Sequence, residues 1–382
     1  MRDILDRLIA FDTVSARPNI DLMHWVRDRL AGAGIEAALI PDAGGGKANL
    51  HAAVGPAGVP GVLLSGHTDV VPVEGQAWSV PPFALTEAGG RYLGRGACDM
   101  KGFVACAIEA MVRAARRPLA VPLHLALSYD EEVGCLGVRS LVDRLAAAPV
   151  RPRLCIVGEP TGMRVATGHK GKVALRATCT GREGHSALAP RALNALHLAA
   201  DFLGALRAMQ ARIAAEGPFD AGYDVPYTTV HAGILRGGVQ VNIVPGLATL
   251  DFEIRSLAGD APDARIAALR GAAEGIAAPL RAAVPEAGIA VDRLWDYPGL
   301  DTPADAAAVR FVQGLTGAGG TIKVAFGTEG GLFDARLGVP TVICGPGSMA
   351  QGHTPDEWVA VDQIERCRTM LARLTDACAA GF

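Results

Sequence analysis

Short apolar runs alternate with amphipathic, alanine-rich stretches along most of the chain. Four runs have the length of strands and are bounded by glycine, proline or acidic residues: 62–65, 123–127, 154–157 and 339–343. Three stretches carry apolar residues at the i, i+3, i+4 spacing of a helix: 100–116, 138–148 and 364–377. Buried strands separated by helices predict an α/β fold with a central, mostly parallel sheet flanked by helices.

The middle of the chain has a different pattern. Alternating apolar and polar residues, typical of half-exposed strands, occur at 172–180, 227–235 and 246–256, and helical patterns occupy 190–216 and 261–278. This order predicts an α+β sandwich of domain size. We therefore expect an inserted domain at 171–297, interrupting a main domain formed by 1–170 and 298–382. No internal repeat is present.

Composition narrows the class of protein. Of the 382 residues, 50% are hydrophobic and 20% charged, and the formal net charge is −3. Such a chain can bury a large core, and it lacks the clustered positive charge that binds nucleic acid or a membrane surface. No stretch approaches 18 consecutive apolar residues, so no membrane span is expected. The start, MRDILDRLIAFD, mixes acids and bases at helical spacing, unlike a signal peptide, and we expect a cytoplasmic protein.

The eight cysteines predict no chemistry of their own. They are far apart, form no CxxC pair, and several lie inside apolar runs such as LCIVGE. In a reducing compartment this pattern is typical of buried thiols rather than of disulfides or a cysteine zinc site.

Metal-ligating residue types follow each of the four predicted strands. His67 and Asp69 come after the first, Glu131 and Glu132 after the second, Glu159 after the third, and His353 after the fourth. In open α/β sheets, ligands bind beyond the carboxyl ends of the strands. These side chains therefore point to one shared site.

The residue types suit a catalytic zinc site. In His67-Thr68-Asp69, one side chain can bind the metal while the other orients a neighbouring ligand. Glu131 and Glu132 would point to opposite sides of an extended backbone, so that one can coordinate while the other acts as general base. Asp99 precedes a predicted helix, and its two oxygens could bridge two metals about 3.5–4 Å apart.

Each of these features also has an ordinary explanation when taken alone. An HxD pair can be a surface or capping pair, two adjacent glutamates are commonly solvated charge before a helix, and His353 could hydrogen-bond within its own turn. Their convergence at the strand ends of one domain favours the metal site.

Five motifs occur in an order that resembles a known family. They are SGHTDVVP (65–72), GRGACDMKG (94–102), DEEVG (130–134), GEPT (158–161) and GHTP (352–355). The chain resembles the co-catalytic zinc amidohydrolases related to acetylornithine deacetylase, succinyl-diaminopimelate desuccinylase and the glutamate-releasing carboxypeptidases. The resemblance covers essentially the whole chain.

The resemblance implies a role for each residue. It makes Asp99 the ligand that bridges two Zn²⁺ ions per subunit, with Co²⁺ as a possible substitute. His67 and Glu159 would complete one metal site, and Glu132 and His353 the other. Asp69 would orient His67, Glu131 would be the general base, and the Asp99–Met100 peptide would be cis.

The inserted domain gains roles from the same resemblance. His185 would stabilise the tetrahedral oxyanion, often in the active site of the partner subunit, and the chain would form a homodimer through this domain. Asn242 and Arg255 would contact the substrate carboxylate, for which a guanidinium is well suited. Without these roles, His185 would be a loop histidine that hydrogen-bonds locally, and Arg255 would be an ordinary surface charge.

The substrate is the least determined feature. Residues 326–333 (FGTEGGLF) and 168–171 (GHKG) resemble the deacetylase versions of these segments. A carboxylate at Glu329 could pair with the δ-ammonium of ornithine, although it could also simply favour a helix N-terminus. We expect hydrolysis of N²-acetyl-L-ornithine to L-ornithine and acetate, a step of arginine biosynthesis.

Other functions remain as alternatives. Succinyl-diaminopimelate desuccinylase or a general N-acyl-amino-acid or peptide hydrolase would use the same centre. A glycine-rich nucleotide-binding enzyme is disfavoured, because neither GxGxxG nor GxxxxGK(S/T) follows a predicted strand in this sequence. A non-catalytic zinc-binding scaffold would have no need of Glu131 or His185.

Overall fold

The buried strands predicted from the sequence all lie in one nine-stranded sheet of the computed structural model, which describes residues 1–382. The strands of this sheet are β1 (Ala37–Pro41), β2 (Ala48–Val54), β3 (Val62–His67), β6 (Leu123–Ser128), β7 (Leu154–Pro160), β8 (Ala166–His169), β15 (Leu300–Asp301), β16 (Ile322–Val324) and β17 (Thr341–Gly345). They run in the order β1-β2-β6-β3-β7-β17-β8-β15, with β16 beside β8. The central pairs β6–β3, β3–β7 and β7–β17 are parallel, whereas β1 and β2 are antiparallel additions at one edge. The predicted α/β class with a mostly parallel central sheet is confirmed.

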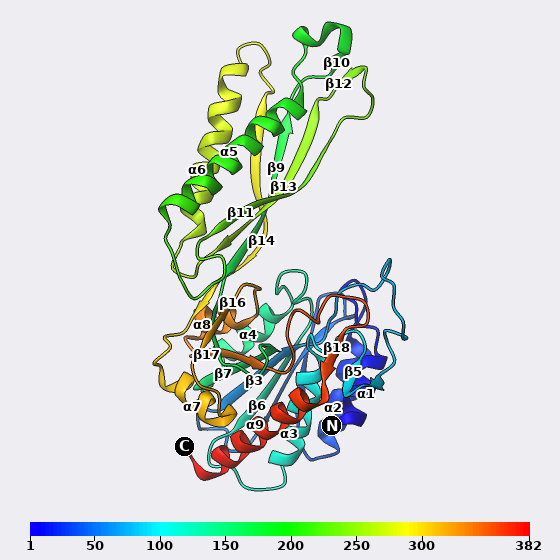
Figure 1. The fold of residues 1–382 in the computed structure, drawn as a ribbon, viewed down its shortest axis with the longest axis vertical. Helices are drawn as coiled ribbons and strands as arrows, with labels where there is room; N and C mark the ends of the chain where they lie inside the picture. Colours follow the sequence, from blue (N-terminus) through cyan, green and yellow to red (C-terminus); the bar gives the residue numbers. More distant parts are fainter. The chain divides into compact units, whose positions relative to one another are not determined.

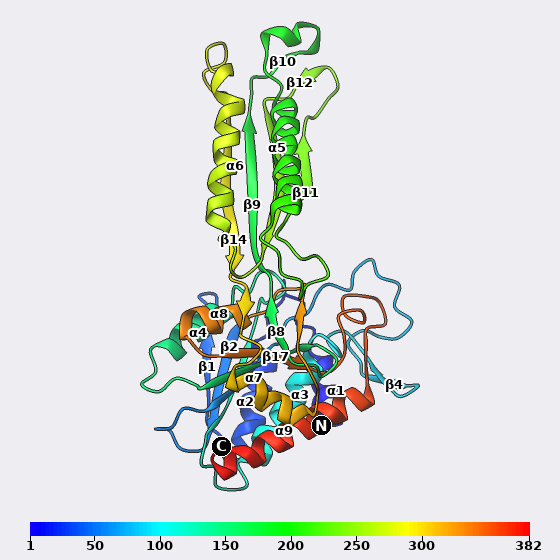
Figure 2. The same cartoon turned by 60° about the vertical axis from the view of Figure 1, so that its left-hand side comes forward.

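Helices cover both faces of this sheet, which explains why its central strands are apolar along their whole length. The helices are α1 (Arg2–Ala10), α2 (Ile20–Ala31), α3 (Lys101–Ala114), α4 (Val138–Ala146), α7 (Ala307–Thr316), α8 (Gly330–Leu337) and α9 (Val361–Ala380). In Figures 1 and 2, α1, α3 and α9 pack together on one face, while α4 and α8 lie on the other. Eleven of the fourteen residues of α3 are buried, because this helix lies between the sheet and α9. A small sheet of β4 (Thr86–Ala88), β5 (Arg91–Leu93) and β18 (Trp358–Ala360) is separate.

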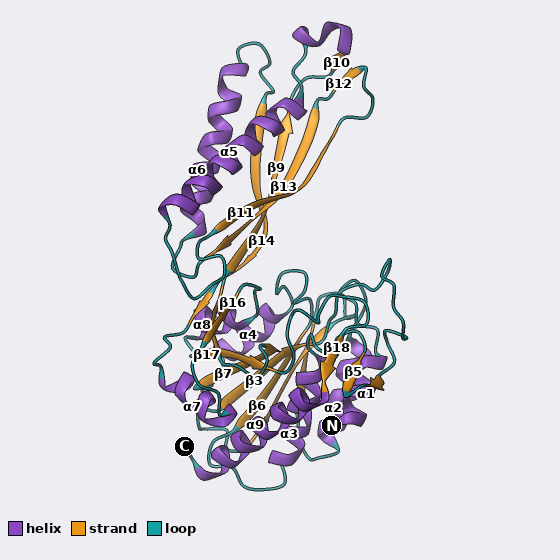
Figure 3. Cartoon of the chain, in the orientation of Figure 1, coloured by secondary structure: helices purple, strands orange, loops and turns teal.

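The chain forms two compact units. The first comprises Met1–His169 and Leu300–Phe382, and the second comprises Lys170–Gly299. The second unit has a four-stranded antiparallel sheet in the order β11-β13-β9-β14, built from β9 (Gly171–Thr180), β11 (Thr229–Gly237), β13 (Leu247–Ser256) and β14 (Gly288–Tyr297). The helices α5 (Ala195–Glu216) and α6 (Pro262–Ala277) pack on one face of that sheet (Figure 3). A two-stranded ribbon of β10 (Gly184–His185) and β12 (Ile243–Val244) completes the unit, with short 3₁₀ turns at Ser186–Arg191 and Ala278–Leu280.

The helix predicted to start at residue 190 begins later. Pro190 lies in a 3₁₀ turn, and Asn194 caps the start of α5 by accepting a hydrogen bond from the Leu196 N–H at 2.9 Å. An asparagine side chain at this position satisfies one of the free N–H groups of the first helical turn. The cap therefore fixes the start of α5, which hydrophobic periodicity alone placed too early.

The structure bears on two further predictions, one about the cysteines and one about membrane-spanning helices. All eight cysteines are buried and free, which confirms the prediction of buried thiols. No helix combines the length and hydropathy needed to cross a bilayer.

Two histidines form a stacked pair on neighbouring strands of the large sheet. His51 Nε2 lies 3.2 Å from His124 Nδ1, and the two rings are nearly parallel with centroids 5.4 Å apart. Burial, the His124 ring and the charge of Arg144 lower the pKa of His51 to about 4, and burial lowers the pKa of His124. The folded state therefore favours two neutral imidazoles.

We predict that this pair makes the fold sensitive to acid. The unfolded chain binds these protons near the ordinary histidine pKa of 6.5, whereas folded His51 binds one only near pH 4. The free energy of unfolding should consequently fall as the pH drops from 6.5 to 4, by on the order of 2 kcal/mol. Denaturant unfolding at pH 7 and pH 4.5 should show a smaller loss for His51→Gln than for the exposed control His24→Gln. Equal losses in the two variants would contradict the prediction.

Candidate metal centre

The carboxyl ends of the parallel strands bring the predicted ligands together in the first unit. His67 is the last residue of β3, and Glu159 lies near the end of β7. Glu132 follows β6, and His353 follows β17. Asp99 lies two residues before α3. Five side chains that are as many as 286 positions apart in the chain thus meet at one edge of the sheet.

Asp99 lies between the two histidines. Its Oδ1 is 3.0 Å from His67 Nε2, and its Oδ2 is 3.1 Å from His353 Nε2. Glu159 Oε1 lies 3.5 Å from His67 Nε2, and Glu132 Oε2 lies 3.1 Å from His353 Nε2. The five residues therefore divide into two halves that share the Asp99 carboxylate.

Glu131 lies on the same side of the centre as His67. His67, Glu131 and Glu159 each offer one ligand atom within 4.8 Å of the others, as do His67, Asp99 and Glu132. The extended backbone expected at the two glutamates is wrong. The Glu131 carbonyl accepts hydrogen bonds from the Gly134 and Cys135 N–H groups, so this segment is a turn. The turn, rather than strand alternation, separates the directions of the two carboxylates.

Asp69 supports both the histidine and the glutamates. His67 Nδ1 lies 2.9 Å from the Asp69 carbonyl oxygen and 3.6 Å from its Oδ1. The Asp69 carboxylate also accepts hydrogen bonds from the N–H groups of Glu131 and Glu132, at 3.1 and 3.3 Å, and from the Ser15 hydroxyl at 2.7 Å. One buried carboxylate thus holds segments that follow two different strands.

A second supporting carboxylate, Glu357, is absent from the predicted set. Glu357 Oε1 accepts hydrogen bonds from the Cys98 and Asp99 N–H groups at 2.9 and 3.0 Å, and Oε2 binds Arg95 Nη1 at 2.6 Å. Arg95 and Glu357 are completely buried. Their signal in the sequence is their position, because Arg95 lies inside GRGACDMKG and Glu357 follows GHTP by two residues. The Asp99–Met100 peptide is cis, as expected.

The centre is crowded with negative charge. Burial and the nearby Asp99 raise the pKa of Glu132 to about 7, and burial raises the pKa of Glu159 well above its ordinary range. Burial would also raise the pKa of Asp99, but hydrogen bonds from His353 and His67 outweigh burial and lower it. Burial, together with the charges of Glu132 and Glu329, raises the pKa of Glu131 well above its usual value.

The donor set fits a pair of divalent cations. Asp99, Glu132 and Glu159 form their ion pairs with histidines, and no lysine or arginine neutralises them. Three buried carboxylates beside only two imidazoles leave an excess of negative charge, which is costly unless a metal binds there. Two imidazole nitrogens and three carboxylates, one of them shared, supply three donors to each of two cations and leave coordination positions open.

Known proteins share this architecture. The chain matches the family described as peptidase family M20/M25/M40 over residues 63–377. It is 37% identical over 380 residues to an acetylornithine deacetylase of Myxococcus xanthus, covering 98% of this chain and 96% of that one. This chain belongs to peptidase family M20/M25/M40. The predicted family and the prediction of a hydrolase are thereby confirmed.

Solved structures of M20 enzymes have the same fold. An M20 metallo-carboxypeptidase from Sulfolobus solfataricus matches with a TM-score of 0.78 at 17% identity, covering 98% of both chains. A dinuclear metal-binding M20 peptidase from Bacillus subtilis matches with a TM-score of 0.68 at 14% identity over the whole of both chains. At these identities the likeness shows the fold alone.

Three of the remaining predicted residues of this M20 chain lie in the second unit: His185, Asn242 and Arg255. His185 of β10 pairs with Ile243 of β12, and Asn242 precedes that strand, so His185 and Asn242 are neighbours. His185 is exposed, and its Nδ1 accepts a hydrogen bond from the Ala187 N–H. The chain leading into this ribbon bonds to Gly246 at the start of β13, whereas Arg255 lies eight residues after that start, and its Nε donates to Glu253 at 2.7 Å. At about 3.3 Å per residue, that is roughly 26 Å along the strand.

Glu329 lies behind the metal centre rather than at its surface. Its carboxylate accepts hydrogen bonds from the hydroxyl groups of Ser128 and Ser65, and the residue is 1% exposed. An ammonium group could reach it only by displacing a serine hydroxyl. The two deacetylase-like segments do meet, because the Gly331 N–H donates to His169 Nε2 at 3.2 Å.

Proposed function

We propose that this M20 enzyme hydrolyses the amide bond of N-acyl amino acids and that its substrate is N²-acetyl-L-ornithine. The observation that carries the reaction type is the Asp99 carboxylate between His67 and His353, with Glu131 beside it. The name of the Myxococcus xanthus relative, which matches over nearly the full length of both chains, supports the substrate.

We further propose that the two cations are zinc, with cobalt as a substitute. Imidazole nitrogen and carboxylate oxygen are ligands that zinc accepts, and no thiolate belongs to the set. His67, Asp99 and Glu159 would hold one ion, and His353, Asp99 and Glu132 the other. When bound, the ions supply an acidified water and polarise the amide carbonyl.

The side chains of the enzyme then move the protons and orient the groups. Glu131 accepts a proton from the attacking water and delivers it to the leaving amine nitrogen. Asp69 keeps His67 and Glu131 in place through its contacts with both segments.

The second unit supplies residues for a homodimeric site in this proposal. His185 would donate a hydrogen bond to the oxyanion, with Asn242 beside it, while Arg255 would bind the substrate carboxylate. The β10–β12 ribbon adjoins the start of β13, and Arg255 lies roughly 26 Å further along that strand, so His185 and Arg255 cannot contact the same small molecule. We therefore infer that His185 and Asn242 serve the active site of a second subunit.

Exposed apolar side chains support the dimer. Val239 is 84% and Val241 100% exposed, and Leu247 is 57% exposed in the same region of the second unit. Clustered apolar side chains on a surface commonly mark a protein interface. Light scattering should give twice the 39.4 kDa mass of one chain, and a monomer in solution would contradict the inference.

A substrate series tests the proposed function. The zinc-loaded enzyme is assayed with N²-acetyl-L-ornithine, N-acetyl-L-norleucine and N-succinyl-diaminopimelate. Norleucine replaces the δ-ammonium by a methyl group of similar size, so a site that pairs with the ammonium should prefer acetylornithine at least about tenfold in kcat/KM. Equal kcat/KM values for N²-acetyl-L-ornithine and N-acetyl-L-norleucine would contradict recognition of the ammonium group by Glu329. A preference for the succinyl substrate would replace the assignment by desuccinylase, and no hydrolysis of any of them would contradict amidohydrolase activity.

A further inference from the structure

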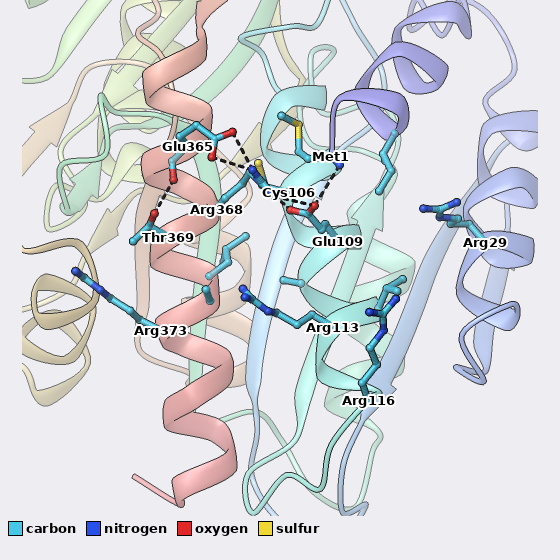
Figure 4. A pocket seen from close by; sticks show the side chains of 15 residues that line it. Met1, Arg29, Cys106, Glu109, Arg113, Arg116, Glu365, Arg368, Thr369 and Arg373 are labelled. Carbon is cyan, nitrogen blue, oxygen red and sulfur yellow. Dashed lines mark hydrogen bonds and ion pairs between the residues drawn. The ribbon is translucent and has the colours of Figure 1, made fainter.

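A hollow outside the metal centre opens between helices of the first unit. It has a volume of about 580 Å³ and is lined by residues of α1, α2, α3 and α9 (Figure 4). Five arginines surround it: Arg29, Arg113, Arg116, Arg368 and Arg373. We call this feature the arginine pocket.

The positive charge of the arginine pocket is mostly uncompensated. Its two acidic residues, Glu109 and Glu365, both bind Arg368, with Arg368 Nε 2.7 Å from Glu109 Oε2 and Nη1 2.8 Å from Glu365 Oε2. Arg373 donates to the Leu315 carbonyl, which carries no charge. Five arginines against two glutamates leave an excess of three positive charges, in a chain whose net charge is −3.

Three of the guanidinium groups are available for a ligand. The Arg29, Arg113 and Arg116 side chains are exposed and form no hydrogen bond or ion pair with the protein, and Figure 4 shows them around the hollow without a partner. Each guanidinium offers five N–H donors in a planar fork that matches phosphate oxygens. Like charges around one hollow repel each other, so an anion bound between them would relieve the repulsion.

The shape of the arginine pocket favours a small ligand. Its volume falls in the range of small-molecule sites, about 300–1,000 Å³. Ile4, Ala110 and Leu371 give it an apolar floor, so the charges surround a concavity rather than forming a stripe along the surface. A nucleic acid or a membrane would contact an extended positive surface instead.

The arginine pocket is separate from the metal centre. Arg113 lies 12 residues after Lys101, the first residue of α3, which is about 18 Å along the helix. A ligand held by Arg113 and Arg116 would therefore not contact the metal ligands that lie before the start of α3. Binding in the pocket does not depend on the proposed reaction.

We propose that the arginine pocket binds a small polyphosphate anion, either free or carried by a nucleoside. Several phosphate groups in one chain match the unpaired guanidinium groups of Arg29 in α2, of Arg113 in α3 and of Arg116 in the turn after α3. Phosphate also carries more charge per group than carboxylate. The bound anion would bridge α2 and α3 through Arg29, Arg113 and Arg116.

Calorimetric titration of the metal-loaded enzyme with inorganic triphosphate tests the proposal. Excess Mg²⁺ limits the removal of metal from the active centre by triphosphate. An ionic strength of about 0.15 M screens the general attraction between triphosphate and positive charge on the protein. A C-terminal affinity tag leaves Met1, which lines the pocket, unaltered. The double variant Arg113→Ser/Arg116→Ser removes two unpaired guanidinium groups. The control Arg27→Ser/Arg310→Ser removes the same charge from helix surfaces outside the pocket.

The expected result is saturable binding of one triphosphate per chain. Affinity should fall about 10²-fold in the pocket variant, because two charge-assisted contacts are lost, and change less than about twofold in the control.

Equal affinity for triphosphate and ATP would assign recognition to the phosphate chain, and tighter binding of ATP would assign it to a nucleoside polyphosphate. Absence of saturable binding, equal weakening in both variants, or tighter binding of citrate or of a single-stranded oligonucleotide would overturn the proposal. Unfolding curves without ligand should coincide for all three proteins, since Arg113, Arg116 and Arg310 are exposed and Arg27 pairs only with the exposed Asp28.

Discussion

Glu131→Gln is expected to lower kcat by about 10³-fold while leaving two bound metal ions per chain. The amide keeps the size of the side chain and can still accept the hydrogen bond that Cys135 Sγ donates to Oε1. It cannot take a proton from water at neutral pH. The measurements are turnover of the best substrate of the series and metal content by mass spectrometry.

The neighbouring carboxylate is a matched control for that substitution. Glu132 differs from Glu131 in facing His353, with its Oε2 3.1 Å from the ring nitrogen Nε2, so Glu132→Gln should lower metal content as well as turnover. The two variants change the same chemical group at adjacent positions. Both should lose turnover, but only Glu132→Gln should lose bound metal. If Glu131→Gln keeps its activity, or loses metal to the same extent as Glu132→Gln, Glu131 is not the general base.

The sequence predicted the fold of the first unit because its signals are local and redundant. Strands such as β3 and β7 are apolar along their whole length since both faces of the sheet are covered, and that pattern is visible without a structure. Parallel strands share one carboxyl edge, so residues that follow them had to meet there. The positions of His67, Glu159 and His353 followed from this rule alone.

The contacts that hold the proposed metal ligands in place could not be predicted in the same way. Glu357 acts through two N–H groups of the segment that carries Asp99, and hydrogen bonds between distant segments leave no periodic pattern in the sequence. The turn at Glu131 was likewise hidden, because it depends on backbone hydrogen bonds to Gly134 and Cys135. Sequence reasoning therefore predicted which side chains meet at the candidate centre and missed part of their support.

The inserted domain shows a different limit. Its alternating strands were recognisable from a period of two, as in β13, where every second residue is buried. The same periodicity says nothing about the distance between His185 and Arg255, because His185 lies on the separate β10–β12 ribbon, which hydrogen bonds between distant segments hold in place. That distance distinguishes a site completed within one chain from a site shared by two.

Asp99→Asn is expected to remove both metal ions rather than one. Each Asp99 oxygen faces a different histidine, at 3.0 and 3.1 Å, so a single substitution affects both halves of the centre. The amide removes one negative charge and replaces one acceptor oxygen by an N–H₂ group, which cannot bind a cation. Affinity for each ion should fall by at least about 10²-fold, more than is typical of a residue that only orients a ligand.

His353→Ala is the comparison that tests whether Asp99 bridges both ions, because His353 would bind only one of them. His353 contacts Asp99 and Glu132 but not His67 or Glu159, so its removal should weaken one site and leave the other. Metal titration should therefore give no tight site in Asp99→Asn, one in His353→Ala and two in the unaltered chain. Circular dichroism of the metal-free proteins must be the same, because a misfolded variant would lose metal for another reason. Two tight sites in a folded Asp99→Asn protein would show that the carboxylate between the histidines does not bridge the cations, and a single tight site there would show that it serves only one of them.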